Sequence, residues 1–131
     1  MNLSNDQQEV KDFTLKLVNA GSNYRVSELK DIYAKDFSIS MLLPDSSIQS
    51  MNYDETIDMF TQRSEAGVAP LSEAATINHI DVVGDKAYVI ITRVMDFVGV
   101  GKEQTIIFHL MLNRSASDQW QVYREHATLS F

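Results

Sequence analysis

Four aromatic or polar side chains recur at even positions of the last predicted strand, where they could support chemistry. Trp120 and Val122 precede Arg124, His126 and Thr128, and residues two apart in a strand share a face. A histidine can act as a general base near neutral pH. An arginine can bind a carboxylate, a phosphate or an enolate. We therefore predict that this row runs from the core into the mouth of a pocket.

A carboxylate near the histidine would complete a proton-transfer pair. A simple hairpin register for the last three strands places Asp96 diagonally near His126, and a carboxylate fixes the tautomer of an imidazole and raises its basicity. We predict Asp96 and His126 as catalytic residues, with Arg124 binding the ligand. The alternative is a one-residue bulge, which would turn Asp96 outward and bring Arg93 and Met95 inward.

Each of these polar residues also has a purely structural interpretation. His126 can be a structural histidine bonded to backbone near the end of the chain, and Arg124 can pair with Glu125 or another surface acid. His109 and Ile107 occupy odd positions of the preceding predicted strand, so their side chains lie on the face opposite to that of the even positions. That face points away from the predicted pocket, so an interface role is favoured for His109.

Composition limits the classes of function. The chain has 131 residues, 44% of them hydrophobic, which fits a single domain over 1–131. A formal charge of −7 disfavours nucleic acid and anionic membranes as partners. The absence of cysteine excludes disulfides and thiolate metal sites, and the histidine spacing does not predict a metal site or a cofactor. The beginning of the sequence lacks a secretion signal, so a cytoplasmic protein is expected.

The amino-terminal part has helical periodicity. Ser4 and Gln7 form a predicted capping box for a first helix over about 5–20, with Gly21 as its stop. Ser27 is the predicted cap of a short second helix. A third helix is expected to begin at Asn52 or Asp54 and to end at Gly67, after a strand pair over 36–43 and 48–51.

The carboxy-terminal half has the alternation of strands. A run that starts near Ala74 turns at Val82–Lys86 into a long strand over 87–97. Two further strands are expected over 103–113 and 120–128. Helices followed by a long antiparallel sheet indicate an α+β fold with the helices on one concave face.

Several segments resemble the nuclear transport factor 2-like superfamily. They are Ala20-Gly21 at the end of the first helix, Ile32–Phe37, Gly84–Val89, and the closing Trp120 and His126. The last two segments are similar to the SnoaL-like and polyketide-cyclase-like branches, and the closing strand is also similar to the association domain of calmodulin-dependent kinase II. The resemblance implies a cone-shaped half-barrel: three helices close the open side of a strongly curved, mostly antiparallel sheet over an internal pocket. It also implies a homodimer through the outer sheet face.

One enzyme of this superfamily can be compared residue by residue. Residues 17–21 and 32–36 resemble ketosteroid isomerase, which needs an aspartate base and a tyrosine oxyanion donor. Those positions fall at Met41 and Thr14. A thioether accepts no proton and threonine is a shorter donor, so isomerase activity is not predicted. Met41 instead suggests an apolar pocket floor.

The sequence thus predicts a protein that binds a small molecule, with proton-transfer chemistry of the SnoaL-like kind on an apolar or anionic substrate. The alternative is a ligand-binding or dimerisation module without catalysis. The predicted ligand-binding residues are Arg124, Met41, Thr14, Phe60 and Trp120. The residues predicted near a homodimer seam are His109, Tyr123 and Ile107.

Overall fold

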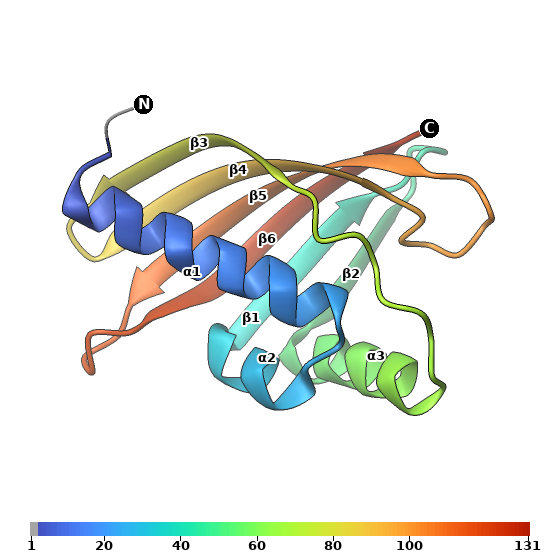
Figure 1. Cartoon of the computed structure of the whole chain (residues 1–131), viewed down its shortest axis with the longest axis horizontal. Helices are drawn as coiled ribbons and strands as arrows, with labels where there is room; N and C mark the ends of the chain where they lie inside the picture. The colour runs from blue at the N-terminus through green and yellow to red at the C-terminus, as the bar shows by residue number, and fades with distance from the viewer. Residues whose placement is uncertain (1–2) are drawn as a thin grey trace.

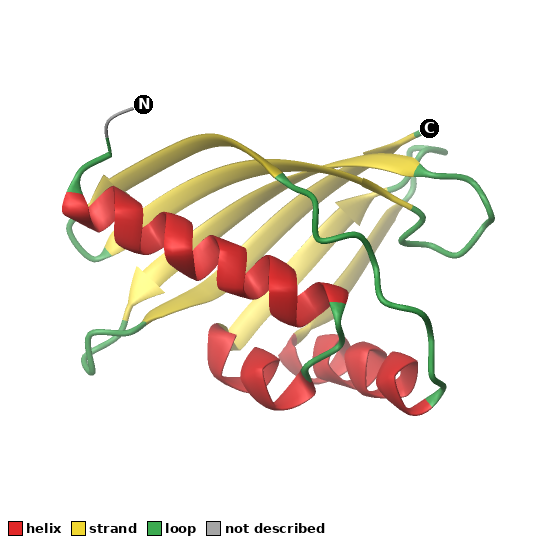
Figure 2. Cartoon of the chain, in the orientation of Figure 1, coloured by secondary structure: helices red, strands yellow, loops and turns green. Residues whose placement is uncertain are grey.

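The computed structural model describes residues 3–131 of the chain. This part contains three helices and six strands, joined by loops and turns (Figures 1 and 2). The helices are α1 (Asn5–Ser22), α2 (Val26–Ile32) and α3 (Tyr53–Glu65). The strands are β1 (Tyr33–Leu42), β2 (Ile48–Asn52), β3 (Thr76–Val83), β4 (Lys86–Met95), β5 (Gln104–Arg114) and β6 (Trp120–Ser130). The predicted α+β class is confirmed.

The six strands form one sheet in the order β2-β1-β6-β5-β4-β3. Every neighbouring pair is antiparallel except β1 and β6, which run parallel. Figure 1 shows the sheet curving, with α1 lying across its concave face and α2 and α3 close to one end of β1. The helices cover one face only, as the order of elements predicts.

The first two helices follow most of the sequence signals. The Ser4 hydroxyl accepts from the amide of Gln7, and the Gln7 side chain accepts from the Ser4 amide, so the predicted capping box is confirmed. The predicted stop at Gly21 is wrong, because α1 continues through it to Ser22. Ser27 is not the cap of α2, which begins at Val26 without a side-chain cap.

The third helix begins at one of the two predicted caps. Asn52 accepts from the amide of Glu55 at 2.9 Å, and Glu55 accepts from the amide of Asn52 at 3.0 Å. The helix ends at Glu65, just before Gly67, which has a positive φ of 67°. The cap fixes the start of α3, and so the position at which Phe60 packs into the core.

The core lies between the helices and the concave face of the sheet. Leu29 of α2, Phe37 of β1 and Leu110 of β5 are almost completely buried there. Burial of side chains this large supplies most of the favourable free energy of folding. Within residues 3–131, no helix is sufficiently long and apolar to span a membrane.

A β-bulge in β6 changes which of its side chains face the core. Val122 pairs with Leu112 and Arg124 pairs with Met111, so Tyr123 is an extra residue in β6. Before the bulge the even positions Trp120 and Val122 are buried; after it, Glu125 and other odd positions are buried. The prediction that the even positions share one face along the whole strand is therefore wrong.

The register of β4 differs from the predicted one as well. Arg93 pairs with Ile106 and Met95 pairs with Gln104, and all four side chains are buried. Odd positions of β4 thus face the core beside even positions of β5. Asp96 follows β4 in an exposed loop. The alternative orientation, with Arg93 and Met95 inward and Asp96 outward, is the one that the protein adopts.

The convex face of the sheet carries the histidines of β5 and β6. His109 pairs directly with His126, and its ring lies 5.7 Å from that of Tyr88. Ile107 is partly exposed on the same face. The predicted outward orientation of His109 is confirmed. Dimerisation through this face stays a prediction.

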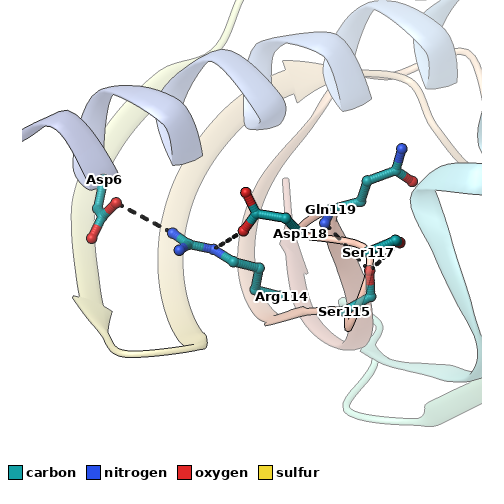
Figure 3. Close-up of polar contacts among 6 residues, drawn as sticks. All are labelled: Asp6, Arg114, Ser115, Ser117, Asp118 and Gln119. Atoms are coloured by element: carbon teal, nitrogen blue, oxygen red, sulfur yellow. Dashed lines mark hydrogen bonds and ion pairs between the residues drawn. The ribbon is translucent and has the colours of Figure 1, made fainter.

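A polar cluster joins the start of α1 to the turn between β5 and β6 (Figure 3). Arg114 lies 3.3 Å from Asp6 and 3.7 Å from Asp118. Its guanidinium also stacks over the ring of Trp120, 4.5 Å from the centroid. Trp120 therefore helps to hold this end of the molecule together.

Candidate active site: a buried glutamic acid in an apolar cavity

A cavity of about 60 Å³ lies between α1, α3 and the concave face of the sheet. That volume is sufficient for about four water molecules. Its walls are mostly apolar and include Leu17 of α1, Phe60 of α3 and Leu110 of β5. The polar or charged side chains in its lining are Tyr33, Thr56, Arg93 and Glu125. An apolar lining with a few polar groups is typical of binding sites for small molecules, and the small volume limits the ligand to a few non-hydrogen atoms.

Glu125 is the carboxyl group of this cavity. It follows the β6 bulge, which turns its side chain into the core, where it is 5% exposed. Burial raises its pKa from 4.5 to about 8, because the charged form loses its hydration, while a polar interaction with the Tyr33 hydroxyl opposes the rise. At pH 7 the group is therefore mostly protonated. It can donate a proton near neutral pH and accept one when ionised.

Tyr33 lies beside this carboxyl, at the start of β1. Its ring packs against Phe37, with 4.3 Å between ring centroids, and both side chains are buried. Burial and the neighbouring Glu125 hold the pKa of Tyr33 well above 10. Tyr33 therefore stays a hydroxyl at physiological pH and can donate a hydrogen bond to an oxygen atom in the cavity.

Arg93 supplies the positive charge of the cavity. Its side chain is 7% exposed, and its Nη2 donates to Ser22 Oγ at 2.7 Å and to the carbonyl of Ser72. Burial lowers the pKa of Arg93, and attraction to Glu73 opposes that change. The guanidinium still keeps its charge at neutral pH. The cavity thus combines a cation with a neutral acid and a neutral phenol.

Asp96 does not take part in this cluster. Its carboxylate accepts from the amides of Gly99, Val100 and Gly101 at 2.7–3.0 Å, and from Gln104 Nε2 at 3.0 Å. The bond from Gln104, followed by the backbone bonds, lowers the pKa of Asp96. The predicted proximity of Asp96 to His126 is wrong. Asp96 instead organises the loop between β4 and β5.

Arg124 and His126 lie on the convex face, because the bulge at Tyr123 reverses the alternation. Arg124 donates from Nη1 to Ser38 Oγ, and His126 is exposed between β1 and β5. The prediction that both face the pocket is wrong. Neither side chain can contact a molecule in the cavity.

The remaining predicted ligand-binding residues are all buried, but only one of them lines the cavity. Phe60 forms part of its wall. Thr14 donates to the carbonyl of Val10 at 2.8 Å, within α1. Met41 packs in the core outside the cavity lining, and Trp120 lies under Arg114. Thr14, Met41 and Trp120 therefore do not bind a ligand in this cavity, and the prediction holds only for the position of Phe60.

Sequence reasoning missed Glu125 and Tyr33, although a signal for one of them exists. After the bulge, the apolar residues Ala127 and Leu129 occupy odd positions, whereas Arg124, His126 and Thr128 are polar. The apolar residues thus move from even to odd positions along the strand. This change indicates that the odd positions, including Glu125, face inward. In residues 3–131 no group of three His, Asp or Glu side chains is arranged to hold a metal ion.

Comparisons with known proteins identify the fold. No family model matches the sequence, and no curated protein matches it. An NTF2-like protein of unknown function from Silicibacter pomeroyi superimposes with a TM-score of 0.76 at 16% identity, over 98% of this chain and 99% of that one. An NTF2-like protein from Cytophaga hutchinsonii gives 0.76 at 16% identity, over 96% and 99%.

A ketosteroid isomerase-like protein from Erwinia carotovora is also similar. Its TM-score is 0.68 at 14% identity, over 97% of this chain and 98% of that one. These structural likenesses extend over nearly the whole length of each chain. The chain therefore has the nuclear transport factor 2-like fold, and its function has to be argued from its own site.

Proposed function

We propose that this nuclear transport factor 2-like chain binds a small, largely apolar molecule in the cavity and that Glu125 exchanges a proton with it. The observation that carries the proposal is a buried carboxyl with a pKa of about 8, placed in an apolar cavity. Enzymes raise carboxyl pKa values by burial in this way, because a proton-transfer group works best when its pKa is near the ambient pH.

Enolisation of a carbonyl compound is the reaction that the geometry fits best. Ionised Glu125 would take a proton from the carbon next to the carbonyl, and the electron pair of that C–H bond would move to the carbonyl oxygen. The Tyr33 hydroxyl would donate a hydrogen bond to that oxygen as its negative charge develops. Return of the proton from Glu125 to carbon restores both partners.

Hydrogen exchange into acetone, a ketone with four non-hydrogen atoms that suits a cavity of about 60 Å³, tests this function. In deuterated water, the protein is expected to accelerate loss of the α-proton NMR signal of the ketone. The rate should increase as the pH is raised through about 8, because only ionised Glu125 accepts a proton. Glu125→Gln should reduce the protein-dependent rate at least about 100-fold, and Tyr33→Phe should reduce it by a similar factor.

A control variant separates this site from the rest of the surface. Glu103→Gln changes an exposed residue in the loop just before β5 and should leave the exchange rate unchanged. Equal exchange by wild type and Glu125→Gln would refute the role of Glu125. Binding of the ketone without exchange would instead select the alternative of a ligand-binding protein without catalysis, which the apolar lining favours.

A further inference from the structure

We propose that the molecule bound in this cavity is a short, apolar monocarboxylate whose carboxylate pairs with the buried guanidinium of Arg93. The inference rests on the proposed function, since the carboxylate would anchor in the same cavity the molecule whose neutral carbonyl Glu125 and Tyr33 act on. It follows from the unused donor of Arg93, from the charge of the cavity and from the size and polarity of its walls.

The guanidinium of Arg93 retains an unused donor. An arginine has five N–H donors. The protein satisfies Nη2, through Ser22 and the carbonyl of Ser72. Nε is buried and has no hydrogen-bond partner among residues 3–131. A buried donor without a partner costs about 1–3 kcal/mol. Neighbouring side chains cover Nε, so a ligand carboxylate that pairs with the guanidinium would shift them slightly and, by accepting from Nε, remove that cost.

The charge of Arg93 is also uncompensated inside the cavity. Within the described part of the chain, no carboxylate forms an ion pair with it; the two ion pairs both involve Arg114. Glu73 attracts Arg93, but its carboxylate is exposed at the surface. Glu125 is mostly neutral at pH 7 because of its raised pKa. A buried cation without a counter-charge is unfavourable, and a ligand carboxylate would supply that charge.

The cavity walls limit what can accompany this carboxylate. Leu17, Phe60, Ile91 and Leu110 surround a volume of about 60 Å³, so the rest of the ligand must be small and apolar. A second charged group would be buried against these side chains without a partner. A planar carboxylate matches the fork of a guanidinium better than a single oxygen does. A short, uncharged body with one carboxylate satisfies all three conditions, and such a body can include the neutral carbonyl of the proposed enolisation.

Binding of acetate, compared with its neutral amide, acetamide, tests the inference. The amide has nearly the same shape but no charge. The carboxylate should bind about 10- to 100-fold more tightly, as expected for a charge-assisted hydrogen bond. NMR of the Arg93 Nε–H group in the wild-type protein should show a shift with the carboxylate that the amide does not produce.

Two arginine variants locate the effect. Arg93→Gln should remove the preference for the carboxylate, so that acid and amide bind with similar affinity. Arg124→Gln, on the convex face, is the matched control and should keep the preference. If Arg93→Gln does not fold, the Nε–H shift in the wild-type protein decides the question.

The outcomes separate this inference from the proposed function. Equal affinity for acid and amide, or no Nε–H response, would overturn the carboxylate inference even if acetone exchange still depended on Glu125. Carboxylate binding through Arg93, together with exchange indifferent to Glu125→Gln, would support the ligand class and overturn the proton transfer.

Discussion

Glu125→Gln is expected to stabilise the protein against unfolding at pH 9 by up to about 5 kcal/mol, and by much less at pH 5. The pKa of Glu125 is about 8 in the folded protein against an ordinary value of 4.5. The difference is about 3.5, and each pKa unit corresponds to about 1.4 kcal/mol. Glutamine occupies nearly the same volume and cannot ionise, so it does not incur this cost.

The sign follows from proton binding in the two states. Between pH 4.5 and 8 the unfolded chain has released the Glu125 proton, while the folded protein retains it. Folding then binds a proton, so the free energy of unfolding falls as the pH increases and levels off above about 8. The groups beside Glu125 do not obscure this effect, because the raised pKa of Tyr33 and the charge of Arg93 keep both protonated up to pH 9.

Urea unfolding of wild type and Glu125→Gln at several pH values between 5 and 9 measures the effect. The difference between the two proteins should widen as the pH increases to about 8 and then level off. Glu103→Gln, which changes an exposed residue, should follow the wild type throughout. Two parallel curves for wild type and Glu125→Gln would mean that the carboxyl is not desolvated in the folded protein.

Phe37→Ala is expected to lower the free energy of unfolding by about 3–5 kcal/mol, the usual range for deletion of a buried phenylalanine ring. Phe37 is 1% exposed and packs against Tyr33 beneath the helices. Loss of its ring removes apolar contacts and leaves a space that the surrounding side chains fill only in part.

Denaturant unfolding at pH 6 measures this loss. Phe131→Ala removes the same ring from a position that is 60% exposed and should change the free energy of unfolding by less than about 0.5 kcal/mol. A loss below about 1 kcal/mol for Phe37→Ala would show that this part of the core collapses around the missing ring.

Much of the fold could be predicted because its signals are local. Ser4 with Gln7 and Asn52 with Glu55 satisfy the free amides of helix starts, and each pair sits within one turn. The turn at Val82–Lys86 joins two strands as predicted. Gly21 was misread as a stop because a glycine can also continue a helix when packing favours it.

The orientation of the site residues depends on the pairing registers of β4, β5 and β6. Sequence patterns within a single strand do not determine those registers. One extra residue at Tyr123 moved Arg124 and His126 to the convex face and brought Glu125 inside. The loop after Asp96 sets a continuous β4–β5 register without a bulge, and in that register the odd positions of β4 face the core instead of the even ones. Alternation describes a regular strand well, but a single bulge exchanges its two faces.

The pKa of Glu125 is the quantity on which the proposed chemistry depends. Carbon-13 NMR of the side-chain carboxyl, recorded between pH 4 and 9 and assigned by comparison with Glu125→Gln, measures it directly. The titration midpoint should fall at about 8. A midpoint near 4.5, the ordinary value of a hydrated glutamate, would contradict the account, because the cavity would then hold a carboxylate that is already charged at neutral pH.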